Sequence, residues 1–133
     1  MKLRMYQVDA FSEKLFTGNP AAVVILESSL KDSVMQSIAF ENNLSETAFV
    51  SIYQSPIYIR WFTPSTEVDL CGHATLASAR ILFEYHRELA GEEIIFDSKS
   101  GILKVTKKKD NLCLNFPEDQ PVEVNSDPIF REI

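Results

Sequence analysis

The sequence predicts an α+β fold in which two helices pack on a mostly antiparallel sheet. Short β-branched runs separated by turn residues make up most of the 133 residues, and only two segments carry apolar residues at helical spacing. The expected order is two strands, a helix, two strands, a helix and three strands. This order favours an α+β layout over a strictly alternating parallel one.

The first part of the chain predicts a strand pair followed by a helix. Strands are expected at residues 5–10 and 21–26, joined by a long irregular connection. Ser29 with Asp32 three residues later matches a helix-capping pattern. Apolar residues then recur at helical spacing, and the helix is expected to end near Asn42-Asn43.

The rest of the pattern predicts a second helix between five further strands. Leu76, Ala79, Arg80 and Phe83 follow a helical period in the segment from His73 to about His86. The basic run Lys107-Lys108-Lys109 precedes a turn-forming pair and is expected to be a solvated hairpin end. The strands are expected at residues 48–52, 58–62, 93–97, 101–106 and 112–116.

The composition predicts one globular domain with a connector at its end. Turn residues and prolines interrupt every apolar run after Phe116, so we expect a domain at 1–117 and the start of an interdomain connector or tail at 118–133. A net charge of −6 argues against a nucleic-acid partner, which needs clustered Lys and Arg. No apolar stretch approaches the roughly 20 residues of a membrane span. The amino terminus also lacks the pattern of a signal peptide, so we expect a cytoplasmic protein without a membrane partner.

The two cysteines and His86 can be interpreted from their positions in the sequence. Cys71 and Cys113 lie far apart without a second pair for a metal site, so free thiols are expected and no metal is predicted. Cys113 falls within a strand pattern and is interpreted as a small core residue. His86 has no companion residue and is expected to be exposed.

Five ordered motifs carry a resemblance to a known family. They run from Val8 to Thr75 and resemble, in this order, successive signatures of the PhzF-like family of phenazine-biosynthesis proteins, with the similarity continuing to about Pro117. The motifs are Val8-Asp9-Ala10-Phe11, Thr17-Gly18-Asn19-Pro20-Ala21-Ala22-Val23, Asn43-Leu44-Ser45-Glu46-Thr47-Ala48-Phe49, Arg60-Trp61-Phe62-Thr63-Pro64 and Val68-Asp69-Leu70-Cys71-Gly72-His73-Ala74-Thr75.

The resemblance implies an architecture larger than this chain. Family members are related in fold to diaminopimelate epimerase, with two similar α+β domains facing each other across a cleft, and they are roughly twice this length. The chain would therefore supply the first domain, a sheet wrapped around or packed on helices. A homodimer or a complementary carboxy-terminal half would complete the site.

Glu46 is the candidate proton carrier. It lies between Leu44 and Thr47-Ala48-Phe49, at the junction of the first helix and a strand, where apolar neighbours would partly desolvate it. Desolvation suits a carboxyl group that must both take and give a proton. Position alone favours a capping or surface carboxylate. The resemblance implies that Glu46 is the catalytic acid/base.

His73, Gly72 and Asn19 are the candidate substrate-binding residues. His73 follows Gly72 at the start of the second helix, where unpaired N–H groups and the helix dipole favour an anion such as a substrate carboxylate. We expect a neutral imidazole, because the dipole disfavours the protonated form. A capping or packing role for His73 and simple turn chemistry for Asn19 are the alternatives, and the resemblance implies substrate binding by both.

Cys71 has two interpretations. A cysteine before glycine at this point is a catalytic base in the related epimerases, and a helix amino terminus lowers the pKa of a thiol. We interpret Cys71 as a residue that lines the site, together with Thr63, Ala74 and Thr75. Arg60 and Glu67 are further candidates for supporting the cleft, and a strand-face or turn role explains them equally well.

These features predict an isomerase domain that needs neither metal nor cofactor and moves a proton on a small carboxylate-bearing metabolite. The site would be incomplete without a second domain or chain. The alternatives are a non-catalytic domain that binds a small acid or a protein, and a thiol-based epimerase half-site that uses Cys71.

Overall fold

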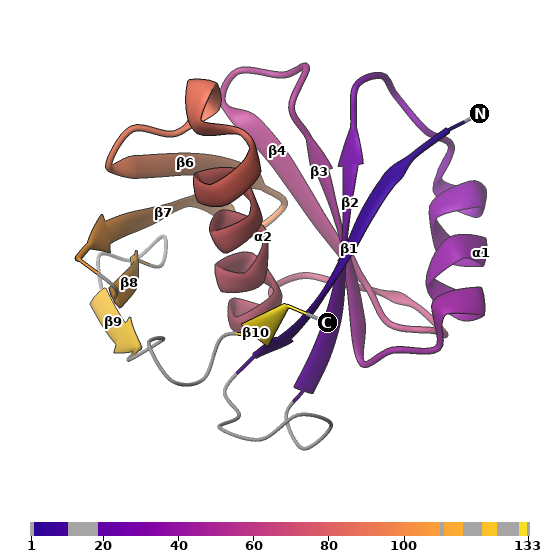
Figure 1. Cartoon of the computed structure of the whole chain (residues 1–133). Helices are drawn as coiled ribbons and strands as arrows, with labels where there is room; N and C mark the ends of the chain where they lie inside the picture. The colour runs from indigo at the N-terminus through magenta and orange to yellow at the C-terminus, as the bar shows by residue number, and fades with distance from the viewer. Residues whose placement is uncertain (1, 11–18, 110, 116–120, 125–130, 133) are drawn as a thin grey trace.

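One curved sheet and two helices form the described part of the molecule (Figure 1). The structure is a computed structural model that describes residues 2–10, 19–109, 111–115, 121–124 and 131–132. The helices are α1 (Asp32–Asn42), α2 (Gly72–Tyr85) and the short 3-10 helix η1 (Arg87–Leu89). The strands are β1 (Arg4–Ala10), β2 (Asn19–Leu26), β3 (Glu46–Ser51), β4 (Ile57–Phe62), β5 (Glu67–Val68), β6 (Glu93–Ser98), β7 (Gly101–Lys108), β8 (Asn111–Asn115), β9 (Pro121–Val124) and β10 (Arg131–Glu132).

The sheet is mostly antiparallel, as the sequence predicts. Its strand order is β10-β1-β2-β3-β4-β6-β7-β8-β9, and β5 pairs with β4. Only β2 with β3 and β4 with β6 run parallel among the described pairings. Each of these parallel pairs is linked through a helix, α1 in the first case and α2 in the second, because a parallel connection needs a crossover. The helices are therefore crossover elements within an α+β sheet.

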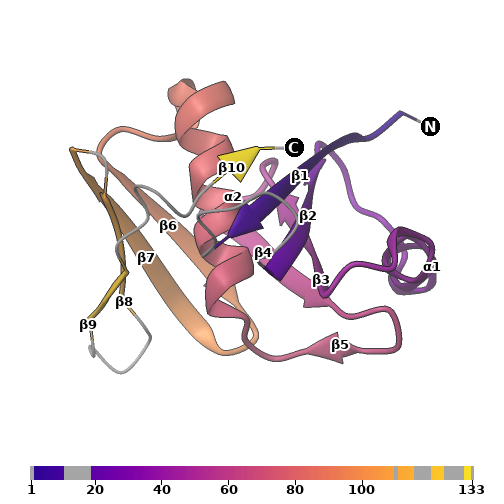
Figure 2. The ribbon, with the colours of Figure 1, turned by 60° about the horizontal axis from the view of Figure 1, so that its bottom comes forward.

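Helix α2 lies in the hollow of the curved sheet (Figures 1 and 2). Residues on all sides of α2 are buried, from Ala74 to Ala79 and from Ile81 to Phe83. The buried surface of α2 is thus wider than the apolar stripe that the sequence predicts. Strands from both ends of the sheet contribute to the same core cluster as α2, among them Val8, Ala48 and Leu114. A helix enclosed in this way has little need of a polar face.

Helix α1 covers the opposite face of the sheet (Figure 2). Its Met35 and Ala39 pack with Val24, Phe49 and Phe62 in a second buried cluster. Strand alternation explains the division, since successive side chains of a strand point to opposite faces. On β2, Val23 and Ile25 belong to the α2 core, whereas Val24 and Leu26 belong to the α1 cluster.

The predicted N-terminal cap of α1 is wrong, whereas the predicted end of the helix near Asn42-Asn43 is confirmed. The N-cap residue is Lys31 rather than Ser29, and no side chain caps the helix there. Asp32 instead forms an ion pair with Arg60, at 2.8 Å. At the other end Asn43 adopts the left-handed conformation (φ 52°), and its N–H donates to the carbonyl of Ala39.

Two expectations about single residues are wrong. His86 is buried, with 4% of its surface exposed, at the end of α2, where its Nδ1 atom lies 3.6 Å from the Glu88 carboxylate. Cys113 is only half-buried, because alternation along β8 places Leu112 and Leu114 in the core. Both cysteines are free thiols, as expected. The basic run ends the β7–β8 hairpin, where Lys109 has a φ of 55°.

Two short strands lie in the part of the chain expected to be a connector. Strand β9 pairs with β8, and β10 pairs with β1 at the other edge of the sheet. The assignment of residues 118–133 to a connector stays a prediction. Among the described residues, no helix has the length and apolar character that a membrane crossing requires.

Candidate functional site

Glu46 and His73 meet where β3 begins and α2 begins. Glu46 is the first residue of β3 and shares the α2-facing side of that strand with Ala48 and Val50. His73 lies in the first turn of α2. Its Nε2 atom is 2.9 Å from Oε2 of Glu46, and the two side chains are only 16% and 19% exposed. The sequence prediction that these residues share one site is consistent with this contact.

The contact is shielded from water and close, but not fully aligned. Nε2 of His73 and Oε2 of Glu46 both have almost no solvent-accessible surface. Their separation is that of an ion pair, whereas the ring N–H direction does not satisfy hydrogen-bond geometry toward the carboxylate.

Cys71 is the third member of the cluster. It is the N-cap residue of α2 and is buried, and its Sγ atom lies 3.5 Å from Nδ1 of His73. The thiol and the carboxylate therefore approach different nitrogens of one imidazole ring. The three side chains form one compact cluster, in which ligand atoms of all three lie within 4.8 Å of one another.

The environment of Cys71 disfavours a thiolate. Burial raises the pKa of the thiol to about 12, the charge of Glu46 adds to this rise, and the backbone N–H groups of Ala74 and His73 oppose it. The expected lowering by the helix terminus is present but smaller than the effect of burial. Cys71 consequently carries its proton at neutral pH.

The neighbouring residues of α2 hold the first turn together. The side chains of Ala74 and Thr75 are fully buried, and Gly72 is half-buried. The Thr75 hydroxyl donates to the carbonyl of Cys71 at 2.8 Å, and its backbone N–H donates to the same oxygen. These two bonds fix the backbone that carries Cys71 and His73. A direct role of Ala74 and Thr75 in lining the site stays a prediction.

The strand pairing places Asn19 and Thr63 near the end of the sheet at which Glu46 begins β3. Asn19 begins β2 two residues before Ala21, which pairs with Glu46 across the parallel β2–β3 ladder. The side chain of Asn19 lies outside the described part. Thr63 follows Phe62, and its hydroxyl accepts from the N–H groups of Ser65 and Thr66 in a tight turn. Their roles at the site stay predictions.

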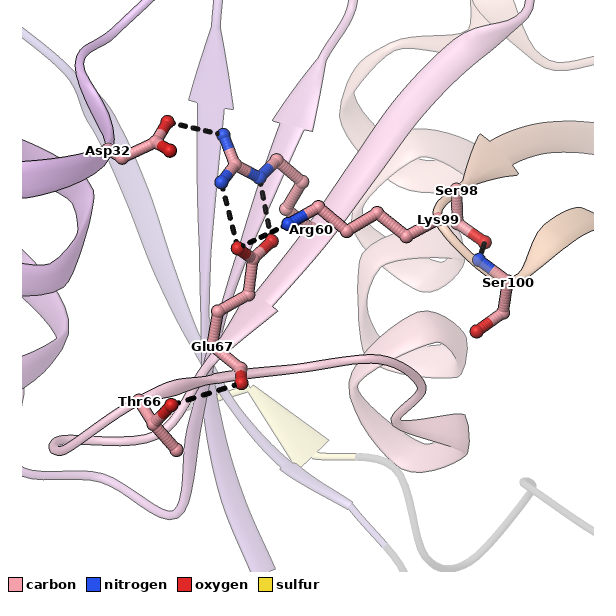
Figure 3. A network of polar contacts seen from close by, with 7 residues as sticks. All are labelled: Asp32, Arg60, Thr66, Glu67, Ser98, Lys99 and Ser100. Carbon is pink, nitrogen blue, oxygen red and sulfur yellow. Dashed lines mark hydrogen bonds and ion pairs between the residues drawn. The ribbon is translucent and has the colours of Figure 1, made fainter.

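Arg60 and Glu67 belong to a separate network on the α1 side of the sheet (Figure 3). The Arg60 guanidinium donates two hydrogen bonds to the Glu67 carboxylate, at 2.7 and 2.8 Å, and a third to Asp32. Lys99 adds an ion pair with Glu67 at 2.8 Å. Arg60 shares a strand face with Phe62 and not with Trp61 of the α2 core, so the network ties β4, β5, α1 and the β6–β7 turn together.

This network was only partly visible in the sequence. The sequence offers Arg60 and Glu67 as candidates for supporting the cleft, whereas it gives no indication of Asp32 and Lys99 as their partners. Residue spacing gives no signal for such a partnership, because the four residues come together only when β4, α1 and the β6–β7 turn have folded. The network stabilises the fold beside the site without contacting Glu46.

Glu46, Cys71 and His73 also offer a set of possible metal ligands. Ligand atoms of Glu46, Cys71 and His73 all lie within 4.8 Å of one another. A metal ion would take one imidazole nitrogen, yet the carboxylate faces Nε2 and the thiol faces Nδ1. A thiol binds a metal ion as the thiolate, and the raised pKa of Cys71 disfavours that form. We therefore interpret the cluster as a set of proton donors and acceptors.

Comparison with known proteins places the chain in a family. The model of the phenazine biosynthesis-like proteins, PhzC-PhzF, matches residues 8–128. The chain belongs to this family. An uncharacterized isomerase of Pseudomonas aeruginosa is 54% identical over 126 residues, which are 95% of this chain and 48% of the relative. An uncharacterized isomerase of Halalkalibacterium halodurans is 52% identical, with 96% of this chain and 48% of the relative covered.

Solved structures support the same assignment. A PhzF-family protein from Enterococcus faecalis superposes with a TM-score of 0.80 at 54% identity, over 86% of this chain and 44% of the other. A predicted epimerase from P. aeruginosa gives a TM-score of 0.67 at 27% identity, over 85% of this chain and 42% of the other. The epimerase-like α+β fold is confirmed. The chain spans about half the length of the relatives that it matches.

Proposed function

We propose that this chain is the Glu46-bearing half of a PhzF-type isomerase that moves a proton between two positions of a small carboxylate-bearing metabolite. One observation carries the proposal: the Glu46 carboxylate and the His73 imidazole meet, largely shielded from water, in a chain whose family relatives are named isomerases. The activity and the substrate class are part of the proposal.

The chemistry assigned to Glu46 is acid/base catalysis. Its carboxylate accepts a proton from carbon, and the resulting acid returns that proton elsewhere on the same carbon skeleton, so that the mass of the molecule is unchanged. The neighbouring imidazole N–H stabilises the carboxylate before the proton arrives. Limited contact with water helps the carboxyl group to keep the proton between the two steps.

The substrate carboxylate is assigned to the start of α2. Gly72 opens this helix, and the dipole of the first turn favours an anion there. The imidazole of His73 contacts Glu46, so the proposal gives His73 a role in supporting the base as well as in binding. Asn19, at the start of β2, is proposed to contact the substrate from the adjacent strand.

The site requires a second wall. The chain spans about half the length of its relatives, which supports a complementary carboxy-terminal half as the missing wall. A homodimer is the second arrangement that would close the site. Sedimentation of the chain at several concentrations separates them, because only the homodimer would form without added protein.

A thiol-based epimerase half-site receives less support. Such a reaction needs Cys71 as a thiolate base, and burial together with Glu46 raises the pKa of the thiol to about 12. A domain that only binds a small acid remains as the outcome that the following experiment would reveal.

The test combines this chain with the carboxy-terminal part of the E. faecalis relative and screens small carboxylic acids by NMR and mass spectrometry. The expected result is a product of unchanged mass and unchanged carbon skeleton with a hydrogen at a different carbon, formed by the pair and not by the pair carrying Glu46→Gln. The matched control is Glu41→Gln, at an exposed carboxylate on α1. An assembled pair that binds acids but converts none would overturn the isomerase in favour of a binding domain.

A further inference from the structure

We infer that Cys71 is a positioning residue: its S–H donates to Nδ1 of His73 and so fixes the imidazole tautomer whose Nε2–H faces Glu46. The catalytic importance of this arrangement rests on the proposed function, whereas the tautomer itself can be measured without any substrate. The inference concerns a side chain that the acid/base proposal does not otherwise use.

The geometry at the imidazole determines which nitrogen carries the proton. Nε2 lies 2.9 Å from the Glu46 carboxylate, and an ionised carboxylate only accepts hydrogen bonds. The favourable arrangement therefore places the ring proton on Nε2. In a neutral imidazole the other nitrogen, Nδ1, is then an acceptor.

Cys71 is placed to supply the donor that Nδ1 requires. Its Sγ atom is 3.5 Å from Nδ1, within the range of a hydrogen bond to sulfur. The thiol keeps its proton at neutral pH, because burial and the nearby carboxylate raise its pKa to about 12. A thiolate in this position would instead favour a proton on Nδ1, which is the opposite tautomer of the neutral ring.

The backbone of α2 holds the thiol in place. Cys71 is 8% exposed and is the N-cap residue of the helix. Its carbonyl accepts the hydroxyl and the backbone N–H of Thr75, at 2.8 and 3.1 Å. The two hydrogen bonds fix the backbone at Cys71, and burial leaves the side chain little room. The sulfur therefore has little freedom to move away from the imidazole.

The test is NMR of the chain with its histidines labelled with ¹⁵N. Long-range ¹H–¹⁵N spectra distinguish the Nε2–H from the Nδ1–H tautomer, and His73→Gln identifies which of the two histidines gives which signals. For the wild-type chain at neutral pH, we expect the Nε2–H tautomer at His73. Cys71→Ala is expected to produce a measurable Nδ1–H fraction, and Cys71→Ser, which retains a donor, is expected to reverse much of that change.

Cys113→Ala is the matched control, since this half-buried cysteine lies on β8 away from the cluster. It should leave the His73 signals unchanged. A wild-type Nδ1–H tautomer would overturn the inference, and so would a Cys71→Ala spectrum identical to the wild type. If the tautomer responds as expected but the assembled isomerase keeps its activity after Glu46→Gln, the proposed function fails while the role of Cys71 in setting the tautomer stands.

Discussion

Nε2 of His73 lies 2.9 Å from Oε2 of Glu46, although one residue begins a helix and the other begins a strand. The contact joins two sequence motifs that only the folded sheet brings together. Because Cys71 approaches the other nitrogen of the same ring, the two ring nitrogens have different partners. The imidazole of His73 therefore lies in contact with both of the other side chains, and Glu46 is the group that we propose reacts with the substrate.

Replacing Arg60 by Met is expected to lower the free energy of unfolding by about 1–2 kcal/mol. The change removes the bidentate contact to Glu67 and leaves this mostly buried carboxylate with Lys99 alone. Partial solvent contact keeps the loss below that of a fully buried pair. Urea denaturation of the two proteins measures the difference.

The surface ion pair between Lys104 and Glu93 provides the control for Arg60. Both side chains are well exposed, at 44% and 39%, so Lys104→Met should cost about 0.5 kcal/mol or less. Equal losses in the two variants would show that the Arg60 network contributes no more than a surface pair.

The Arg60 network also predicts a loss of stability in acid. The hydrogen bond from Arg60 holds the pKa of Glu67 below its ordinary value of 4.5, and the contact with Lys99 acts in the same direction, against the opposing effect of burial. A lowered pKa means that the unfolded chain binds the proton first. The stabilisation is therefore complete above pH 4.5 and is lost as the pH falls through the folded-state value.

Denaturation of the wild type and of Glu67→Gln between pH 7 and pH 2 checks this prediction. The stability difference between the two proteins should shrink as the pH falls below 4.5. Glu93→Gln, at an exposed carboxylate, serves as the reference for unspecific charge effects. A difference that stays constant or widens toward pH 2 would contradict the assigned direction.

Alkylation should distinguish the two cysteines. With its pKa raised to about 12 by burial and by Glu46, Cys71 is expected to react with iodoacetamide far more slowly at pH 8 than the half-buried Cys113. Glu46→Gln removes one of the charges that disfavour the thiolate, so the variant should react faster at Cys71. Peptide mass spectrometry follows both sites, and rapid labelling of Cys71 in the wild type would argue against a neutral thiol.

Much of the fold was predictable because the strands are short, β-branched and bounded by turns. Residues 58–62 and 93–97 match β4 and β6 to within one residue at each end. The burial of α2 was not predictable from its own pattern, since the sheet that encloses it includes strands from both ends of the chain. The same reason explains His86, whose burial depends on the packing around the end of α2.

The candidate site was partly predictable. The family-like motifs indicated Glu46 and His73, but only the register of β3 and the position of α2 establish that the two side chains meet. The thiol of Cys71 shows most clearly what could not be predicted from the sequence. Its place at a helix terminus predicted a lowered pKa, and burial, which no sequence spacing reveals, has the larger and opposite effect.

The central claim is that Glu46 carries the proton, and the fate of that proton tests it most directly. The chain assembled with the carboxy-terminal part of the E. faecalis relative is given a converted acid in deuterated water, and NMR follows the label at each carbon. Because the acid returns the proton that it took, we predict conversion with little deuterium at the carbon that receives the proton, and we expect the conversion to be lost in Glu46→Gln and retained in Glu41→Gln. Undiminished conversion by the Glu46→Gln protein would contradict the account.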